Sequence, residues 1–417
     1  MEINLNNLMG QCSCGKSHTL DVKEIIIAEG AISKVNPFLI EAGIGEAPVL
    51  ICDKNTYHAG GEALYSTLTG HKKSIIVLQE DKIDADEKAV QWVIEELGSE
   101  ITGLIAVGAG TIHDITRYVA KQYNLPFISV PTAASVDGFV STVAAMTMNG
   151  FKITYPAVSP IAVFADTHIF SKAPYGLTAA GVADLLGKYT ALLDWEISHL
   201  LTGEYICPKV VAIEKEALQQ VVDTAREIRK GSKQAYEGLM YGLLLSGLAM
   251  QMVGNSRPAS GAEHHMSHLW EMHAINPQVD ALHGEKVGVA LGIVCDHYKK
   301  VMEIDNIKGQ VPLYKGFPKE ELKKIFKDLY PSILEENMPD LLQQIDPQVL
   351  VENFGNLKQL IEDLPTGDDI RDILTQAGAK TSLSDIGLSP TILEKSIMYS
   401  PFVRRRLTLM RVLKLIQ

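Results

Sequence analysis

The chain has 417 residues, of which 46% are hydrophobic and 21% are charged, and its formal net charge is −12. This composition is typical of a folded globular protein and excludes a disordered or fibrous one. The acidic balance argues against nucleic acid as a partner, because a protein that neutralises phosphates needs surplus Lys and Arg. The length exceeds that of one ordinary hydrophobic core and predicts two domains.

The N-terminal region carries potential metal ligands but no targeting pattern. The segment MEINLNNLMGQ lacks the basic and apolar regions of a secretory signal, and five scattered cysteines suggest a reducing compartment, so we expect a cytoplasmic protein. The apolar stretch 238–254 is short for a bilayer span and predicts a buried helix instead. Cys12, Cys14 and His18 are possible metal ligands, although their spacing is not that of zinc knuckles. A metal site and a plain thiol-containing loop both remain open at this point.

The first 170 residues alternate between strand and helix patterns. Short runs rich in Ile and Val occur at 24–29, 47–53, 73–78, 102–108, 126–131 and 161–166, with amphipathic stretches such as 84–100 between them. This pattern predicts a Rossmann-like α/β domain over 1–170 with a mostly parallel sheet. From 171 to 417 only helical periods continue, which predicts an all-helical second domain and an active site in the cleft between the two.

Two segments at predicted strand ends are suited to a phosphate-containing ligand. LIAVGAGTIHD runs from a strand through Gly108 and Gly110 into a helix, whose first amides can bind an anion. The dinucleotide fingerprint G-x-G-x-x-G is incomplete, because its third glycine, which would come just before Asp114, is missing. PTAASVDGFVS follows the next strand and offers Thr132 and Ser135 before Asp137. A tight turn and ordinary helix caps are the alternatives for these segments.

The segment SGAEHHMSHLWEMH at 260–273 concentrates four histidines. In a helix, His264 and His268 lie one turn apart on the same face and can serve one ion or one ligand. A zinc-protease helix is disfavoured, because Glu263 precedes the first histidine of the pair instead of following it. A polar helix face without metal remains the alternative.

Taken together, five motifs resemble a family of metal-dependent, NAD(P)-linked dehydrogenases that includes glycerol dehydrogenase and iron-containing alcohol dehydrogenases. The motifs are GAGTIHD, PTAASVDGFVS, GVADLLGKYTA, SRPASGAEHHMSH and LHGEKVGV, in that order. Among its branches, the chain most resembles the glycerol-1-phosphate dehydrogenases. Other members of the fold, a plain glycerol or alcohol dehydrogenase and a dehydroquinate-synthase-like lyase, are the alternatives, as is a non-catalytic nucleotide-binding protein.

The resemblance assigns roles to individual residues. It implies metal ligands at Asp184, His264 and His283, and substrate contacts at Asp137, Asp184 and His268, with Asp184 and His268 as catalytic residues. The implied cofactor contacts are Asp53 at the adenosine ribose, and Gly108, Gly110, Thr111, Ile112, His113, Asp114, Thr132, Ala133, Ala134, Ser135 and Ser141. Ala109 departs from the glycine common at that position in the family.

The resemblance also implies the reaction, its cofactor and metal ion, and the oligomeric state. We expect reduction of dihydroxyacetone phosphate to sn-glycerol 1-phosphate with NAD(H) or NADP(H), and a homodimer. One carboxylate and two imidazoles form an open three-ligand site that Ni²⁺, Zn²⁺ and Fe²⁺ all tolerate. The resemblance implies zinc in archaeal members and nickel in bacterial relatives, and the bacterial-looking N-terminal extension favours nickel over zinc, with iron last. Asp53 would repel a 2′-phosphate and so favours NAD. Arg257, in a loop before the histidine helix, is a candidate contact for the substrate phosphate, with a structural interaction with Glu263 or the loop as the alternative.

Overall fold

A computed structural model describes residues 1, 3–148, 151–308, 314 and 316–416. The chain divides into a first unit, Met1–Val182 with Gln219–Gly254, and a second unit, Ala183–Leu218 with Asn255–Gln417. The sequence predicted one boundary near residue 170, whereas the chain returns to the first unit at 219–254. The return follows from close packing of α10 (Lys233–Val253) in that unit. At Gly247 an added Cβ would lie 2.6 Å from the Asp137 carbonyl oxygen, so only glycine fits there.

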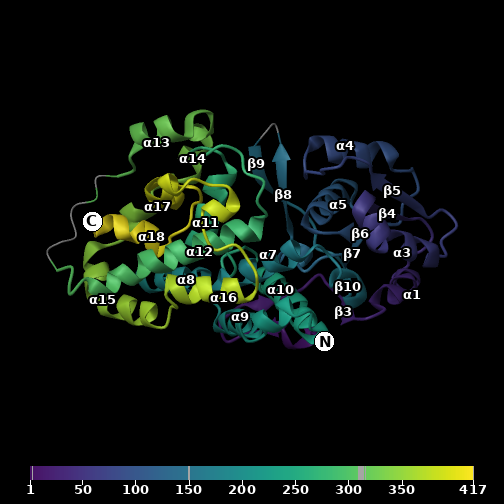
Figure 1. The fold of residues 1–417 in the computed structure, drawn as a ribbon, viewed down its shortest axis with the longest axis horizontal. Helices are drawn as coiled ribbons and strands as arrows, with labels where there is room; N and C mark the ends of the chain where they lie inside the picture. Colours follow the sequence, from purple (N-terminus) through teal and green to yellow (C-terminus); the bar gives the residue numbers. More distant parts are fainter. Residues whose placement is uncertain (2, 149–150, 309–313, 315, 417) are drawn as a thin grey trace. The chain divides into compact units, whose positions relative to one another are not determined.

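The first unit is built on a six-stranded parallel sheet in the order β3-β10-β7-β6-β4-β5 (Figure 1). Each of the six predicted apolar runs contains one strand, which confirms the predicted α/β class. The bounds are β3 (Glu24–Ala28), β4 (Pro48–Asp53), β5 (Ser74–Leu78), β6 (Gly103–Gly108), β7 (Phe127–Pro131) and β10 (Ala162–Asp166).

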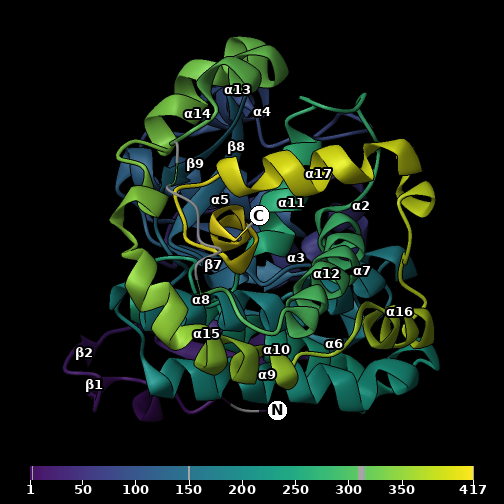
Figure 2. The same ribbon diagram turned by 90° about the vertical axis from the view of Figure 1, so that its left-hand side faces the viewer.

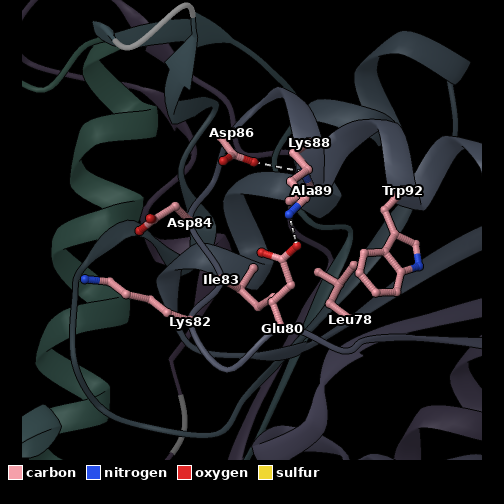
Figure 3. Close-up of a pocket in the computed structure, with 9 residues that line it drawn as sticks. All are labelled: Leu78, Glu80, Lys82, Ile83, Asp84, Asp86, Lys88, Ala89 and Trp92. Atoms are coloured by element: carbon pink, nitrogen blue, oxygen red, sulfur yellow. Dashed lines mark hydrogen bonds and ion pairs between the residues drawn. The ribbon is translucent and has the colours of Figure 1, made fainter.

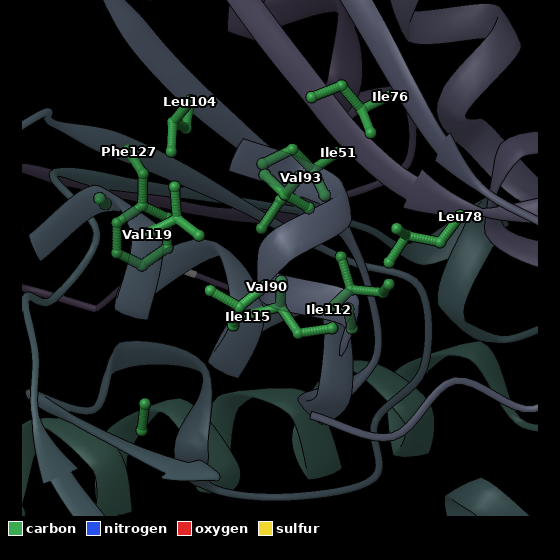
Figure 4. Close-up of a cluster of buried hydrophobic side chains, with 14 of the residues drawn as sticks. Ile51, Ile76, Leu78, Val90, Val93, Leu104, Ile112, Ile115, Val119 and Phe127 are labelled. Carbon is green, nitrogen blue, oxygen red and sulfur yellow. The ribbon is translucent and has the colours of Figure 1, made fainter. Parts of the chain in front are cut away.

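Both faces of this sheet are covered, as expected for parallel strands. Along β4, Val49 and Ile51 join the core formed with α4 (Glu87–Glu96) and α5 (Gly110–Tyr123), part of which is drawn in Figure 4. Leu50 and Cys52 face the opposite core, which is formed with α1 (Val35–Glu41) and α3 (Glu62–Thr67). The alternation of side chains along a strand therefore explains why its whole sequence is apolar.

Several shorter elements complete the first unit. The antiparallel hairpin of β8 (Val143–Met148) and β9 (Phe151–Pro156) was not predicted from the sequence. It contributes Ala144, Met146 and Met148 to the α5 side of the core, in the alternation typical of a strand with one buried face. The remaining elements are β1 (Gly10–Gln11), β2 (Ser17–His18), α2 (Lys54–Thr56), a π-helical turn at Tyr57–Gly61 and α6 (Thr167–Phe170).

The second unit is helical throughout its described residues, as the sequence predicted (Figure 2). Its helices are α8 (Lys188–Thr202), α11 (Ala262–Glu271), α12 (His283–Lys299), α13 (Lys319–Phe326), α14 (Tyr330–Glu336), α15 (Pro347–Glu362), α16 (Gly367–Gln376), α17 (Leu393–Tyr399) and α18 (Leu409–Val412). Two further helices, α7 (Tyr175–Leu186) and α9 (Pro208–Arg229), contain residues of both units. In the described part of the chain, every helix is too short or too polar to cross a membrane.

A buried carboxylate fixes the start of α11, the helix that carries the histidines. Asp194 Oδ2 accepts a hydrogen bond from the Ala262 amide (2.8 Å), and Oδ1 accepts from the Tyr298 hydroxyl (2.7 Å) and the Leu409 amide (2.7 Å). Burial raises the pKa of Asp194 to about 7. At Gly261 an added Cβ would lie 2.7 Å from Asp194 Oδ2, so this approach also requires glycine.

Candidate functional site

Three residues predicted as metal ligands lie together in the second unit. Asp184 of α7, His264 of α11 and His283, the first residue of α12, each direct a ligand atom into one group whose members lie within 4.8 Å of one another. His264 Nε2 is 3.5 Å from Asp184 Oδ1, and the rings of His264 and His283 are 5.3 Å apart. Residues separated by up to 99 positions in the sequence thus converge on a single point.

The imidazole of His264 is oriented by a second carboxylate. Its Nδ1 donates to Glu263 Oε1 (2.7 Å), which leaves Nε2 directed at Asp184. Glu263 is fully buried and also accepts from the Gly261 amide (2.7 Å) and the Thr190 hydroxyl. Carboxylate–imidazole pairs of this kind fix the tautomer of a metal-binding histidine, so Nε2 is prepared as a ligand atom.

His283 is oriented in the same way. Its Nδ1 lies 3.0 Å from Glu271 Oε1, and Lys286 Nζ contacts the same oxygen at 3.0 Å. His268 stacks on His283 with ring centres 5.7 Å apart, and His268, Glu271 and His283 form a second group with metal-binding geometry. His268 therefore lies beside the triad, which is the position expected of a substrate contact.

The charges of the site favour an ionised Asp184 and a protonated His264, whose proton a bound metal ion must displace. Burial alone would raise the pKa of Asp184, but Lys188 and His264 outweigh it and hold the pKa below its usual value. Burial lowers the pKa of His264, yet its contacts with Asp184 and Glu263 prevail and raise it to about 9. Burial, together with Arg404, lowers the pKa of His268 well below its usual value, so that ring is uncharged near neutral pH. The carboxylates of Asp184, Glu263 and Glu271 therefore favour a positive charge at this site.

The predicted cofactor residues gather at the carboxyl ends of three neighbouring strands in the first unit. Asp53 ends β4, Gly108 ends β6, and Thr132 follows β7. These three strands are neighbours in the sheet, in the order β7-β6-β4. The Thr132 amide donates to the Gly108 carbonyl (3.0 Å), which joins two of the predicted segments. The ends of such strands are the usual place for a nucleotide in an open α/β sheet.

Within the glycine segment only some side chains can face a ligand. Gly110 begins α5, and the preceding Ala109 provides no side-chain cap for its first amides. Ile112 and His113 are buried, and His113 hydrogen-bonds through Nδ1 to the Ala109 carbonyl (3.0 Å) and through Nε2 to Ser129 Oγ (2.7 Å). Burial and Arg117 lower the pKa of His113 to about 3. Positions 112 and 113 can therefore contact a cofactor through their backbone only.

Asp53 has a structural task besides its predicted contact with the cofactor. Its Oδ1 accepts from the Thr56 amide (2.8 Å), and its own amide donates to the Thr56 hydroxyl (2.9 Å), so it caps α2. A carboxylate has a second oxygen, which can accept a hydrogen bond from a ribose hydroxyl.

The segment from Thr132 to Ser141 lies close to the protein core. Thr132, Ala133, Ala134 and Ser135 are buried, whereas Asp137 and Ser141 are half-buried. Asp137 Oδ2 accepts from the Ser246 hydroxyl (3.1 Å), and the Ser141 hydroxyl bonds to the backbone of Val143. A buried arginine, Arg117, donates to the carbonyl oxygens of Gly138, Phe139 and Ser141 in this segment and to that of Val143 at the start of β8.

Arg257 is buried and already ion-paired. Its Nη2 donates to Glu204 Oε2 (3.0 Å) and to the carbonyl oxygens of Asp194 (3.0 Å) and Leu407 (2.7 Å). The sequence suggested Glu263 as the alternative partner, but the structure has Glu204. Its Nε and Nη1 have no hydrogen-bond partner among the described residues, so they retain the capacity to donate.

A small pocket in the first unit lies next to the end of β5 (Figure 3). Its lining includes Leu78, Trp92 and the ion pair of Glu80 with Lys88, and none of its residues belongs to the predicted cofactor set. Its volume of about 40 Å³ is far below that of a site for a dinucleotide.

Similarity to known proteins agrees with this geometry. Residues 26–174 match the family model described as iron-containing alcohol dehydrogenase. A glycerol-1-phosphate dehydrogenase (NAD(P)+) of Geobacillus thermodenitrificans is 34% identical over 400 residues, which is 94% of this chain and 92% of that protein. The chain belongs to the glycerol-1-phosphate dehydrogenase family. A glycerol-1-phosphate dehydrogenase (NAD(P)+) of Bacillus velezensis is 43% identical over 288 residues, covering 68% of this chain and 73% of that protein.

Solved structures of more distant proteins share the fold of this glycerol-1-phosphate dehydrogenase family member. The crystal structure of maleylacetate reductase from Agrobacterium tumefaciens has a TM-score of 0.63 at 15% identity and covers 92% of this chain and 91% of its own. That of sulfoacetaldehyde reductase from Bifidobacterium kashiwanohense, in complex with NAD+, has a TM-score of 0.60 at 16% identity and covers 92% and 91%. These likenesses bear on the fold alone.

Sequence reasoning missed the residues that support the predicted site. Glu263 was considered only as a protease base or an ion-pair partner of Arg257, and Thr190, Glu271 and Arg117 were not singled out. Helical periodicity gives no indication of Glu263, because adjacent residues of a helix do not share a face. Its place in the first turn of α11, where a carboxylate is favoured by the helix dipole, is the one available sign.

Proposed function

We propose that this chain is an NAD(P)-dependent sn-glycerol-1-phosphate dehydrogenase, which reduces dihydroxyacetone phosphate to sn-glycerol 1-phosphate for lipid synthesis. The observation that carries this proposal is the 34% identity to a glycerol-1-phosphate dehydrogenase over 92% of that protein, combined with the Asp184, His264 and His283 cluster. Sheet-end residues suited to a dinucleotide and an anionic cluster suited to a cation are both requirements of this reaction.

Asp184, His264 and His283 are proposed to hold one divalent cation. The donor set fits such an ion, because each imidazole is bound through Nδ1 by a carboxylate and presents Nε2, and Asp184 is held ionised by Lys188. When bound, the ion supplies a Lewis acid that polarises a substrate carbonyl. Mixed oxygen and nitrogen ligands accept Ni²⁺, Zn²⁺ and Fe²⁺ alike. Because the similar proteins include bacterial ones, we propose nickel first and zinc second, with Fe²⁺ less favoured.

His268 is proposed to contact the substrate and to transfer a proton between it and water. Its ring lies 6.0 Å from that of His264 and 5.7 Å from that of His283, measured between ring centres. A neutral imidazole can donate from one nitrogen while it accepts at the other, which is what such a relay requires. Asp137 is proposed as a second substrate contact, and Arg257 Nε and Nη1 as donors to the substrate phosphate.

The cofactor is proposed to lie at the carboxyl ends of β4, β6 and β7. The second oxygen of Asp53 would accept from the adenosine ribose, and the amides from Gly110 to Asp114 would bind the pyrophosphate. Thr132 to Ser135 and Ser141 would line the remainder. Because Asp53 repels a 2′-phosphate, we propose a preference for NAD over NADP. The interdomain cleft, the homodimer and the cytoplasmic location remain predictions.

A substrate panel tests this function. The purified chain, loaded with Ni²⁺ or Zn²⁺, is assayed with NADH and NADPH against dihydroxyacetone phosphate and dihydroxyacetone, and with NAD+ and NADP+ against glycerol. We expect efficient reduction of the phosphorylated ketone alone, and its loss together with bound metal in His283→Ala. His297→Ala is the matched control, because it removes a half-buried histidine of the same helix that is outside the cluster. Equal turnover of phosphorylated and unphosphorylated substrates would contradict the proposal.

A further inference from the structure

The N-terminal hairpin of the first unit carries another cluster of potential metal ligands. The strands β1 and β2 pair Gly10 with His18, and the turn between them is closed by bonds from the Cys12 amide to the Lys16 carbonyl and from the Gly15 amide to the Cys12 carbonyl, both 3.0 Å. This turn brings the sulfur atoms of Cys12 and Cys14 and a ring nitrogen of His18 within 4.8 Å of one another. None of the three has a role in the proposed reaction.

The imidazole of His18 is oriented as a metal ligand. His18 is 2% exposed, and its Nδ1 lies 2.8 Å from the carbonyl oxygen of Met252, near the end of α10. Because a carbonyl only accepts, Nδ1 carries the proton, and Nε2 presents its lone pair to Cys14 Sγ at 3.4 Å. The same anchoring of the distal nitrogen by a backbone carbonyl is common for histidines that bind metals.

The distances agree with a tetrahedral site. With zinc–sulfur bonds of about 2.3 Å and zinc–nitrogen bonds of about 2.1 Å, sulfur and nitrogen ligands of a tetrahedron lie about 3.6 Å apart. The observed 3.4 Å between Cys14 Sγ and His18 Nε2 lies within about 0.2 Å of this value, which is the tolerance expected for a metal site. Cys12 and Cys14 are partly exposed, so an ion can reach them from solvent. Thiolates select a softer ion than the oxygen and nitrogen atoms of the Asp184 cluster do.

We propose that Cys12, Cys14 and His18 bind a zinc ion, which holds the N-terminal hairpin to the end of α10. Water or another group of the chain would provide the fourth ligand. The ion would have a structural role, since none of the three side chains is among the proposed substrate or cofactor contacts. It would stabilise the folded chain in proportion to its binding, because only the folded hairpin brings the ligands together.

Metal counting on the full chain tests this proposal. The protein is purified with a reductant free of thiols and saturated with Zn²⁺, and bound zinc is measured after removal of loose ions. We expect two ions per chain, one in His264→Ala, one in Cys14→Ser, and none in the double variant. Cys52→Ala is the matched control, because it removes a buried cysteine of the same unit and should leave two ions. Retention of both ions by Cys14→Ser would overturn the proposal.

X-ray absorption on His264→Ala loaded with zinc provides a second test that does not depend on the cysteine variants. The proposed site gives sulfur scattering at about 2.3 Å from zinc, with at least two sulfur atoms, whereas the Asp184 cluster contains no sulfur. A spectrum with only oxygen and nitrogen neighbours would overturn the proposal. Near-ultraviolet circular dichroism of Cys12→Ser and Cys14→Ser verifies that each variant is folded, so that a lost ion reports on a lost ligand.

Discussion

The buried carboxylate of Glu263 should control how tightly the site binds metal. In Glu263→Gln the shape of the side chain is kept, but the charge-assisted hydrogen bond to His264 Nδ1, 2.7 Å long, is weakened. Loss of such a partner of a metal-binding histidine lowers metal affinity by about 10- to 100-fold. At about 1.4 kcal/mol for each tenfold change, this corresponds to roughly 1.4–2.8 kcal/mol.

The size of this effect should depend on pH in a defined direction. Glu263 strengthens the affinity of His264 for a proton as well as for a metal ion, and its contact helps to raise the pKa of His264 to about 9. Above that pKa no proton competes, so the variant should show the whole deficit. Near neutral pH the proton must leave before metal binds, and the variant releases it more easily, which offsets part of the loss.

The assay is competition for Ni²⁺ or Zn²⁺ against a chelator of known affinity, at about pH 9.5 and about pH 7. We expect a deficit of 10- to 100-fold at the higher pH and a smaller one at the lower pH. Glu196→Gln serves as the control, because it makes the same chemical change at a surface ion pair with Lys215 in the same unit. Wild-type affinity of Glu263→Gln at the higher pH, or a deficit that grows as the pH falls, would refute this reasoning.

Three further predictions concern other residues. Asp53→Ala should raise the KM for NADH more than the KM for NADPH. The control Asp86→Ala, which removes a similar helix cap, should lower the free energy of unfolding by about 1 kcal/mol and leave both KM values unchanged. The same change of KM in both variants would refute the ribose contact. Because the pKa of His113 is lowered to about 3, its contribution to stability is complete above pH 6.5 and is lost as the pH falls towards 3. Between these pH values, His113→Gln should make the free energy of urea unfolding fall less steeply with decreasing pH, by up to about 1.4 kcal/mol per pH unit. An unchanged pH dependence would contradict this. Arg257→Ala should raise the KM for dihydroxyacetone phosphate by orders of magnitude and leave the weak turnover of dihydroxyacetone nearly unchanged, whereas equal losses with a lower melting temperature would assign the guanidinium to its ion pair with Glu204.

The sheet could be predicted from the sequence because strands buried on both faces leave continuous apolar runs. Each of the six runs became a strand, from Glu24–Ala28 to Ala162–Asp166. The hairpin of β8 and β9 escaped prediction, because only Val143 and Thr147 of its first strand favour a strand, and the two alanines and two methionines between and after them do not. The return of α10 to the first unit was also not predictable, because it depends on the fit of Gly247 against Asp137 rather than on any local pattern.

The site, like the fold, could be predicted from the sequence only in part. Asp184, His264 and His283 were predicted from the resemblance, and the structure brings them together. The partners that orient them, Glu263 and Glu271, act through contacts across turns and between helices, which periodicity does not reveal.

The central claim is most directly tested by the stereochemistry of the product. The metal-loaded chain is incubated with dihydroxyacetone phosphate and NADH, and the glycerol phosphate formed is offered to a dehydrogenase specific for the sn-3 enantiomer. We expect one phosphate ester formed per NADH oxidised, and no oxidation of that product by the sn-3-specific enzyme. A product that this enzyme consumes, or no reduction of dihydroxyacetone phosphate by the metal-loaded chain, would contradict the proposed function.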